Sequence, residues 1–269
     1  MLSIAEPEMR TASPDAADKW TTERVTRIHY WTPTLLSFRT TRYRAFRFTP
    51  GHYARLGLGP ADDLVWRPYS LVSAHYDDYL EFVAVLVPGG AFSEQLAKLR
   101  VGDEIAVEKA CFGFLTTAQL APGRDLWMLA SGTGLGPFIS ILRDPAQWEA
   151  FERLIVVHSV RHVTELTYRD EIAALSDEAL FADARAKLSY IPVVTRDDGA
   201  TELRDRLPRL LADGRLEKQA QIPINADYSR VMVCGNPELA RELRQLLATR
   251  GFATSRRGAA GQMAFEKYW

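Results

Sequence analysis

The hydrophobic pattern of the chain changes near residues 116–124, and this change constrains the fold more than any other feature. Residues 21–107 contain short runs rich in β-branched and aromatic residues, separated by turn signals such as TPG, YDD and VGD. Several short strands at this spacing are typical of an antiparallel sandwich or barrel. Beyond the change, continuous apolar runs alternate with helical patterns, as in a parallel sheet buried on both faces. The sequence therefore predicts a β domain followed by an α/β domain.

The two patterns also suggest where the domains begin and end. We expect a tail at residues 1–18, a first domain at 19–120 and a second domain at 121–269, with the boundary in TTAQLAPGR. The apolar runs of the second domain are DLWMLAS, RLIVVHS, KLSYIPVV and SRVMVCG. Its clearest helix is NPELARELRQLLATRG, because Asn236 can cap the first turn and Gly251 can end the last one.

Composition excludes several classes of protein. A net charge of −1 over 269 residues argues against a general nucleic-acid binder. Two cysteines, Cys111 and Cys234, cannot form a disulfide framework, a four-thiolate metal site or an ordinary iron–sulfur cluster. The first residues lack the pattern of a signal peptide, and no run reaches the roughly 20 apolar residues that span a bilayer. We therefore expect a cytoplasmic protein without bound metal.

A glycine-rich segment, SGTGLGP, follows the first apolar run of the second domain. Gly132, Gly134 and Gly136 lie between a buried strand and a predicted helix. Glycine lets the backbone approach a pyrophosphate closely, and the start of a helix favours negative charge. A plain turn is the alternative for such a motif alone, but the strand–turn–helix context favours a dinucleotide site.

The next apolar run ends in VVHSVR, where an NAD site would usually carry an acidic residue. Ser159 and Arg161 stand there instead, and Arg196 follows the next strand. A hydroxyl and guanidinium groups suit a 2′-phosphate, because arginine forms charge-assisted, fork-shaped hydrogen bonds with it. Each arginine alone could be a solvated surface residue. Whether Arg204 or Arg206 adds a third cation stays open.

The segment RPYSLVSA in the first domain places a cation, an aromatic ring and a hydroxyl close together. In a strand, Arg67 and Tyr69 share one face, and Pro68 and Ser70 share the other. The alternatives are an ordinary sheet surface and a site for a flat, phosphorylated cofactor. Ser70 can join such a site only if the strand ends or twists there.

Two further segments bear on a site in the second domain. VMVCGNPEL places Cys234 and Gly235 at the end of a buried strand, where the simplest role for the cysteine is a small buried hydrophobe. The last residues, Tyr268 and Trp269, are aromatic, and they could pack against either a core or a flat ring system.

Four segments, RPYSLVSA, SGTGLGP, VMVCGNPEL and FEKYW, occur in the order seen in ferredoxin (flavodoxin)–NADP reductases of the bacterial type, and the chain resembles this family from about Lys19 to Trp269. The resemblance implies a six-stranded antiparallel β-barrel that binds FAD, followed by a parallel α/β domain of five strands that binds NADP. It also implies a monomer whose partners are ferredoxin or flavodoxin, and the charge and the apolar runs discussed above predict no nucleic acid and no membrane as partners.

The resemblance implies roles for individual residues. Arg67 would hold the FAD phosphate, Tyr69 would stack on the isoalloxazine, and Ser70 would lie near flavin N5. The other residues implied at FAD are Pro68, Val85, Val87, Phe92, Ser93, Thr133, Tyr268 and Trp269. The residues implied at NADP are Gly132, Gly134, Ser159, Arg161, Arg196, Arg206, Cys234 and Gly235. The residues implied in catalysis are Ser70, Cys234, Glu266, which resembles a proton-handling carboxylate, and Tyr268.

The function implied is an FAD-dependent oxidoreductase that moves electrons between NADPH and a one-electron carrier, ferredoxin or flavodoxin. Hydride would pass between the nicotinamide and flavin N5. Two alternatives are a reductase component that serves an oxygenase and a flavin-carrying subunit without turnover.

Overall fold

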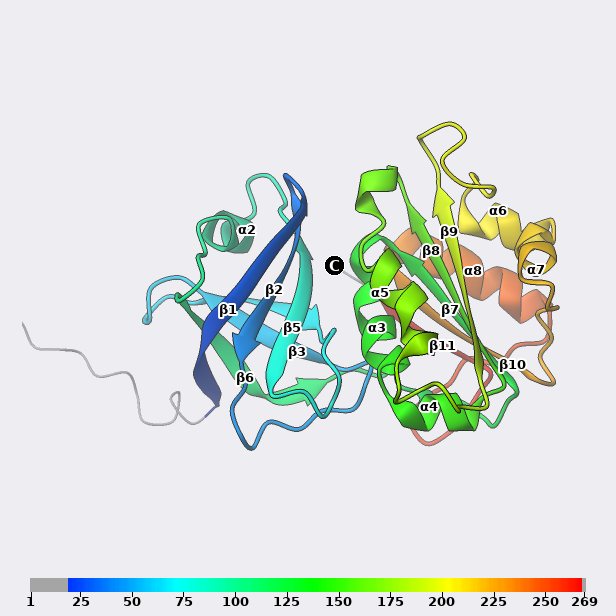
Figure 1. Ribbon diagram of the computed structural model, residues 1–269, viewed down its shortest axis with the longest axis horizontal. Coiled ribbons are helices and arrows are strands. Elements are labelled where there is room, and N and C mark those ends of the chain that lie inside the picture. The colour runs from blue at the N-terminus through cyan, green and yellow to red at the C-terminus, as the bar shows by residue number, and fades with distance from the viewer. Residues whose placement is uncertain (1–18, 268–269) are drawn as a thin grey trace, which may run out of the picture.

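The structure is a computed structural model that describes residues 19–267, and positions 1–18 and 268–269 lie outside its description. It consists of an antiparallel sheet of six strands and a parallel sheet of five, which form two lobes side by side (Figure 1). The predicted fold class is therefore confirmed. Within the described part of the chain, no helix has the length and apolar character needed to cross a membrane.

The first sheet is a barrel with the strand order β4-β3-β6-β1-β2-β5. Its strands are β1 (Trp20–Thr32), β2 (Leu35–Thr41), β3 (Tyr53–Leu58), β4 (Val65–Ser70), β5 (Tyr79–Val85) and β6 (Glu104–Phe112). Two bonds bring the end of β4 to β5, because Val72 N donates to Glu81 O at 2.8 Å and Glu81 N donates to Ser73 Oγ at 3.2 Å. A helix, α2 (Ala91–Leu96), lies at one end of the barrel (Figure 1).

The side chains that alternate along these strands fill the barrel. Phe38 of β2 lies directly opposite Phe82 of β5, and the two ring centroids are 5.5 Å apart. Both rings are buried with Leu36, Leu56 and other apolar residues of the same core. Burial of such aromatic pairs is a main source of stability in a small barrel.

The second sheet is parallel, with the order β11-β10-β7-β8-β9. Its strands are β7 (Asp125–Ser131), β8 (Arg153–Val160), β9 (Lys187–Val194), β10 (Ser229–Gly235) and β11 (Met263–Lys267). The four predicted apolar runs correspond to β7, β8, β9 and β10, whereas the apolar pattern did not reveal β11. Strand β7 lies between β8 and β10, so the direction of winding reverses there. The carboxyl ends of β7 and β10 therefore form the topological switch point where such sheets bind ligands.

Helices cover both faces of this sheet (Figure 1). One face packs against α3 (Gly136–Leu142), α4 (Pro145–Ala150) and α5 (Arg169–Ala174), and the other against α6 (Leu207–Ala212), α7 (Arg215–Ala220) and α8 (Pro237–Thr249). Short 3₁₀ turns are η1 (Thr117–Gln119), η2 (Gly132–Leu135), η3 (Val163–Glu165) and η4 (Leu175–Asp177). The predicted cap of α8 is confirmed, since Asn236 Oδ1 accepts hydrogen bonds from Glu238 N and Leu239 N at 2.8 and 3.3 Å.

A buried charge cluster joins the two lobes at Glu81 of β5. The carboxylate lies 3.3 Å from Arg39 Nη2 of β2 and 3.2 Å from Arg143 Nη1, at the end of α3. Tyr168, at the start of α5, donates its hydroxyl to Glu81 Oε1 at 3.2 Å. Apolar residues of the barrel, including Val72 and Val83, share a core with the parallel sheet. The two lobes are therefore packed together rather than merely tethered.

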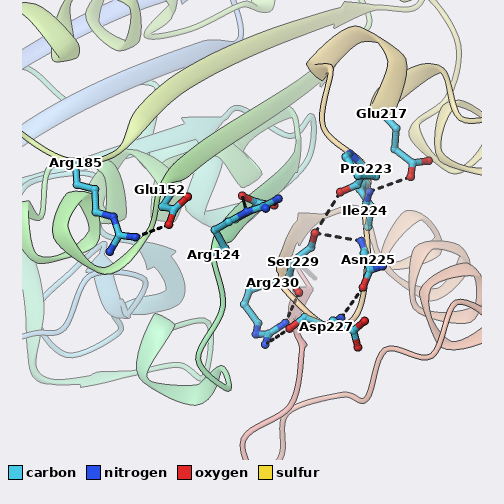
Figure 2. Close-up of polar contacts among 11 residues, drawn as sticks. Arg124, Glu152, Arg185, Glu217, Pro223, Ile224, Asn225, Asp227, Ser229 and Arg230 are labelled. Carbon is cyan, nitrogen blue, oxygen red and sulfur yellow. Dashed lines mark hydrogen bonds and ion pairs between the residues drawn. The ribbon is translucent and has the colours of Figure 1, made fainter.

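The segment between the lobes is fixed at the amino end of β10. Arg230 is almost completely buried, and its Nε donates to Ala121 O at 2.8 Å while its other nitrogens reach the carbonyls of Pro122, Ala226 and Asp227. Figure 2 shows this guanidinium turned toward the loop at Asp227. These bonds attach the connecting segment to the parallel sheet, at the end of the strands opposite the switch point.

Candidate active site

A cavity of about 570 Å³ lies where the barrel meets the switch point of the parallel sheet. A volume of this size is typical of cofactor and ligand sites. Most of its wall comes from the barrel, and Thr133 and Glu266 close it from the second lobe. Its lining residues are Tyr53, Arg67, Pro68, Tyr69, Ser70, Val83, Ala84, Val85, Val87, Gly90, Ala91, Phe92, Ser93, Thr133 and Glu266.

The predicted RPYS segment forms one wall of this cavity. Arg67, Pro68, Tyr69 and Ser70 all line it, although an ideal strand would direct them to alternate faces. β4 ends at Ser70, and an end or a twist at this point was the condition for this serine to join the site. Tyr69 is mostly buried, its ring centroid lies 5.3 Å from that of Phe92, and burial raises its pKa to about 12. The wall thus presents a fixed aromatic ring with a cation beside it.

A second wall comes from β5 and the turn before α2. Val85, Val87, Phe92 and Ser93, which the resemblance implied at FAD, all line the cavity. Ser93 Oγ accepts a hydrogen bond from Val87 N at 3.0 Å, which fixes the turn. Val85 and Val87 are 40% and 52% exposed, so this wall is an apolar surface that the protein itself leaves uncovered.

Five lining residues are not found by sequence reasoning: Tyr53, Val83, Ala84, Gly90 and Ala91. Tyr53 of β3 lies directly opposite Ser70 of β4, so its place depends on the register between these strands. Gly90 and Ala91 lie in the segment VPGGAFS, directly before the predicted Phe92 and Ser93, and this proximity is the one signal that could have pointed to them.

The loops at the switch point interlock closely. A Cβ on Gly134 would lie 2.3 Å from the carbonyl oxygen of Cys234, so only glycine permits this approach. Ser131 Oγ accepts a hydrogen bond from Asn236 N at 3.1 Å, which ties the end of β7 to the turn after β10. Gly132 has a φ of +53°, in the left-handed region that favours glycine. The predicted residues Gly132, Gly134 and Gly235 therefore meet at one place, with Thr133 facing the cavity.

Glu266 reaches the cavity from β11, opposite Cys234 in the sheet register. Its Oε2 is buried and has no hydrogen-bond partner among the residues that the structure describes. Burial raises the pKa of this carboxyl to about 7. An unpartnered buried carboxyl oxygen beside a cavity indicates a group that meets a ligand or carries a proton.

The Cys234 side chain is fully buried and is not among the described residues that line the cavity. It packs in the core on one face of the parallel sheet, while its carbonyl borders the glycine turn. The implied role of its thiol at the nicotinamide stays a prediction.

The arginines predicted for a 2′-phosphate fall into two groups. Arg161 and Arg196 follow the neighbouring strands β8 and β9, and Arg196 N donates to Arg161 O at 2.9 Å, with Ser159 at the end of β8. Both side chains are exposed, as a surface anion site requires. Arg206 instead begins α6 and pairs with Glu242 of α8 at 2.9 Å. Arg204 pairs with Asp198 at 3.5 Å, so neither candidate for the third cation stands apart from a carboxylate.

An acidic side chain braces the first of these groups. Asp197 accepts hydrogen bonds from Val163 N and His162 Nδ1, both at 2.7 Å, and these contacts lower the pKa of its carboxyl. Asp197 follows Arg196 directly, and His162 follows Arg161. The aspartate thus joins the two loops that carry the arginines.

The cavity suits FAD on three counts. Its aromatic and apolar lining, with a few polar groups, is typical of cofactor sites, Tyr69 and Arg67 offer a stacking face and a cation, and Glu266 brings an unpartnered oxygen. Tyr268 and Trp269 lie outside the described residues, so their predicted contacts with FAD stay predictions. Among described residues, no group of three or more His, Cys, Asp or Glu could hold a metal.

Two family models match the chain, one in each lobe. An oxidoreductase FAD-binding domain matches residues 30–114, and an oxidoreductase NAD-binding domain matches residues 128–245. The chain is 40% identical to ferredoxin–NADP reductase A of Sorangium cellulosum, over 92% of this chain and 90% of that protein. It is 37% identical to the ferredoxin–NADP reductase of Pseudomonas aeruginosa, over 91% and 96%, respectively.

A solved structure agrees with these relatives. The ferredoxin–NADP⁺ reductase of Neisseria gonorrhoeae, crystallised with bound FAD and NADP, superposes with a TM-score of 0.87 at 35% identity, over 93% of this chain and 99% of that one. The flavodoxin/ferredoxin–NADP reductase of Rhodobacter capsulatus is 34% identical over 91% of this chain and 92% of that protein. The resemblance seen in the sequence is thereby confirmed, and the chain belongs to the bacterial ferredoxin/flavodoxin–NADP reductases.

Proposed function

We propose that this protein is an FAD-dependent oxidoreductase that moves electrons between NADPH and a small carrier, ferredoxin or flavodoxin. One observation carries the proposal above the others. The cavity with an aromatic wall and a cation opens onto the switch point of a nucleotide-binding sheet, so a flavin and a nicotinamide can meet there.

The barrel residues would hold FAD. Arg67 would neutralise the FAD phosphate, Tyr69 would pack on the isoalloxazine, and Ser70, at the end of β4, would offer its hydroxyl near flavin N5. The turn before α2, with Phe92 and Ser93, would support the pyrophosphate. Bound FAD supplies the chemistry that couples a hydride donor to one-electron carriers, while the protein supplies position and excludes water.

The parallel sheet would hold NADP(H) in an orientation that brings the nicotinamide to the flavin. The turn at Gly132 and Gly134 would receive the pyrophosphate, and Arg161 and Arg196 would receive the 2′-phosphate, with Ser159 beside them. Arg206 is the weaker member of this group, because Glu242 already pairs with it. Hydride would then pass between nicotinamide C4 and flavin N5.

Three residues would complete the site. Glu266 would hold a proton at the cavity wall, since burial keeps its carboxyl protonated up to near-neutral pH. Tyr268 would cover the second face of the flavin and Trp269 the adenine, a proposal that rests on the family resemblance alone.

We take residues 19–120 as the FAD-binding domain and residues 121–269 as the NADP-binding domain. That the working unit is a monomer is a proposal that rests on the family resemblance. We propose the reducing cytoplasm as the protein's compartment, since the chain has only two cysteines.

The proposal is tested under anaerobic conditions. Purified protein loaded with FAD is mixed with a bacterial ferredoxin or flavodoxin and with either NADPH or NADH. We expect NADPH to reduce the carrier far faster than NADH does. Arg161→Gln and Arg196→Gln should each raise the KM for NADPH by about tenfold, with little change in the KM for NADH, because NADH has no 2′-phosphate.

Arg24→Gln is the matched control, since this arginine is exposed on the barrel and pairs with Glu104. A carrier that neither coenzyme reduces would remove the proposed function. Equal rises in KM for both coenzymes would remove only the 2′-phosphate assignment.

A further inference from the structure

His158 is a fully buried histidine that the proposed site does not use. It lies in β8, within the VVHSVR segment, and its ring makes two hydrogen bonds. Nε2 lies 3.1 Å from the carbonyl oxygen of Gly132, in the glycine turn, and Nδ1 lies 3.2 Å from the hydroxyl of Tyr190 in β9. The imidazole therefore connects the turn to the strand two places away in the sheet.

Only one arrangement of protons satisfies both contacts. A carbonyl oxygen can only accept, so Nε2 must carry the hydrogen and donate it to Gly132. Burial lowers the pKa of His158 to about 4, so the ring is neutral and Nδ1 keeps a lone pair. Tyr190 must then donate its hydroxyl to Nδ1, and burial raises the pKa of this tyrosine, which keeps its proton in place. The tautomer is thus fixed from both sides.

The bond to Gly132 also fixes a neighbouring donor. In a trans peptide, the carbonyl of one residue and the N–H of the next point in opposite directions, and the described chain contains no cis peptide. Because the Gly132 carbonyl points inward to His158, the Thr133 N–H points away from the imidazole. Thr133 lines the cavity, and its N–H belongs to the first turn of η2, which provides it with no acceptor.

Packing alone does not hold this peptide. A Cβ placed on Gly132 would meet no atom within 4 Å, so the outer side of the turn is open. With a φ of +53°, glycine can rotate to other conformations at little cost. The hydrogen bond from His158 is therefore a side-chain restraint on this peptide, in addition to the backbone turn of η2 that Gly132 begins.

We propose that His158, held by Tyr190, is a positioning residue that orients the Gly132–Thr133 peptide so that the Thr133 N–H meets the diphosphate of the nicotinamide nucleotide. This inference rests on the proposed function, because it assumes that NADP(H) binds at the switch point. It assigns to His158 a contribution shared by NADPH and NADH, whereas Arg161 and Arg196 distinguish the two.

Binding of two probes to the oxidised, FAD-loaded protein tests the inference. NADP⁺ carries both the diphosphate and the 2′-phosphate, whereas adenosine 2′-monophosphate carries only the latter. We expect His158→Leu to weaken NADP⁺ binding by about tenfold and adenosine 2′-monophosphate binding by less than about twofold, as measured by calorimetry. His158→Gln keeps an N–H donor near the Nε2 position, so it should recover most of the NADP⁺ affinity.

Nitrogen NMR of protein labelled at histidine gives a readout independent of binding. The signals of His158, identified by their absence from the His158→Gln variant, should show a neutral ring protonated at Nε2 from about pH 5.5 to 8. Tyr190→Phe should keep that tautomer and weaken NADP⁺ binding by about threefold. These two measurements decide the matter even if His158→Leu does not fold.

An Nδ1-protonated ring would overturn the inference, as would His158→Leu protein that binds NADP⁺ as tightly as the unaltered chain. Equal weakening of both probes would also overturn it, since that result means a general disturbance of the sheet. If the unaltered protein binds neither probe, the proposed function fails and the inference fails with it.

Discussion

Glu266 has the property at the residue scale that is most open to measurement. Its carboxyl has an ordinary pKa of 4.5, which burial raises to about 7. Between these values the native protein keeps a proton that the unfolded chain has lost. The native state then binds more protons, so its stability falls as pH rises through this window.

We therefore expect Glu266→Gln to remove part of the pH dependence of stability. The unfolding free energy of the variant minus that of the unaltered protein should be larger at pH 8 than at pH 5. Urea unfolding of the FAD-loaded protein at the two pH values measures it. Glu104→Gln, at a mostly exposed carboxylate, is the control that should leave the slope unchanged. Parallel stability curves for Glu266→Gln and the unaltered protein would contradict the account.

A local residue pattern pointed to the RPYS part of the cavity wall, whereas the family resemblance implied Val85, Val87, Phe92, Ser93 and Thr133. The period-two alternation placed Arg67 and Tyr69 on one face. For Ser70 to join the site the strand had to end or twist there, and β4 does end at Ser70. Tyr53 could not be predicted in this way, since it reaches the cavity through the register of β3 against β4. Sequence reasoning also did not predict the hydrogen bond between His158 and Gly132, because the glycine turn lies 26 residues earlier in the chain.

At the scale of elements, hydrophobic periodicity located the strands that are buried on both faces. DLWMLAS and KLSYIPVV match β7 and β9 residue for residue. MAFEK escaped detection because this segment is short, ends in two charged residues and becomes a strand by pairing with β10 at the edge of the sheet. Closure of the barrel was equally invisible, since it depends on bonds between Val72 and Glu81 rather than on any local pattern.

The contact between β5 and α3 gives a prediction at this scale. Glu81 is buried with Arg143 and Arg39, so Glu81→Gln would leave two guanidinium groups without their shared counter-charge. We expect a loss of about 3 kcal/mol in unfolding free energy, because removal of one member of a buried ion pair strands the other. Denaturant unfolding of the FAD-loaded protein measures this loss.

Glu171→Gln is a matched control, because Glu171 pairs with the same Arg143 at 2.9 Å but its side chain is half exposed. An exposed pair contributes at most about 1 kcal/mol, so this variant should unfold almost as the unaltered protein does. Equal losses of unfolding free energy in Glu81→Gln and Glu171→Gln would mean that burial does not determine how much each ion pair of Arg143 stabilises the protein.

For the whole molecule, the position of the site follows from how the two lobes meet. The barrel provides an aromatic wall with a cation, and the switch point of the parallel sheet provides the glycine turn and Glu266. Neither lobe encloses the cavity alone. The buried cluster at Glu81 and the shared apolar core hold the lobes together, so two cofactor sites face one another across a fixed boundary.

Sequence patterns predicted both lobes but not the interface at which they pack together. The order of the strands and the contacts of Arg143 with the barrel depend on interactions between distant segments, which no window of sequence contains. The joint position of the flavin and nucleotide sites in the sequence-based account came from the family resemblance.

The central claim is that NADPH reduces a flavin held between the two lobes. Anaerobic titration of the FAD-loaded protein with NADPH, followed by flavin absorbance, tests it most directly. We expect about one equivalent of NADPH to bleach the flavin, and NADH to require a large excess, since NADH lacks the 2′-phosphate that Arg161 and Arg196 would bind. A protein that holds FAD but is not bleached by NADPH would contradict the account.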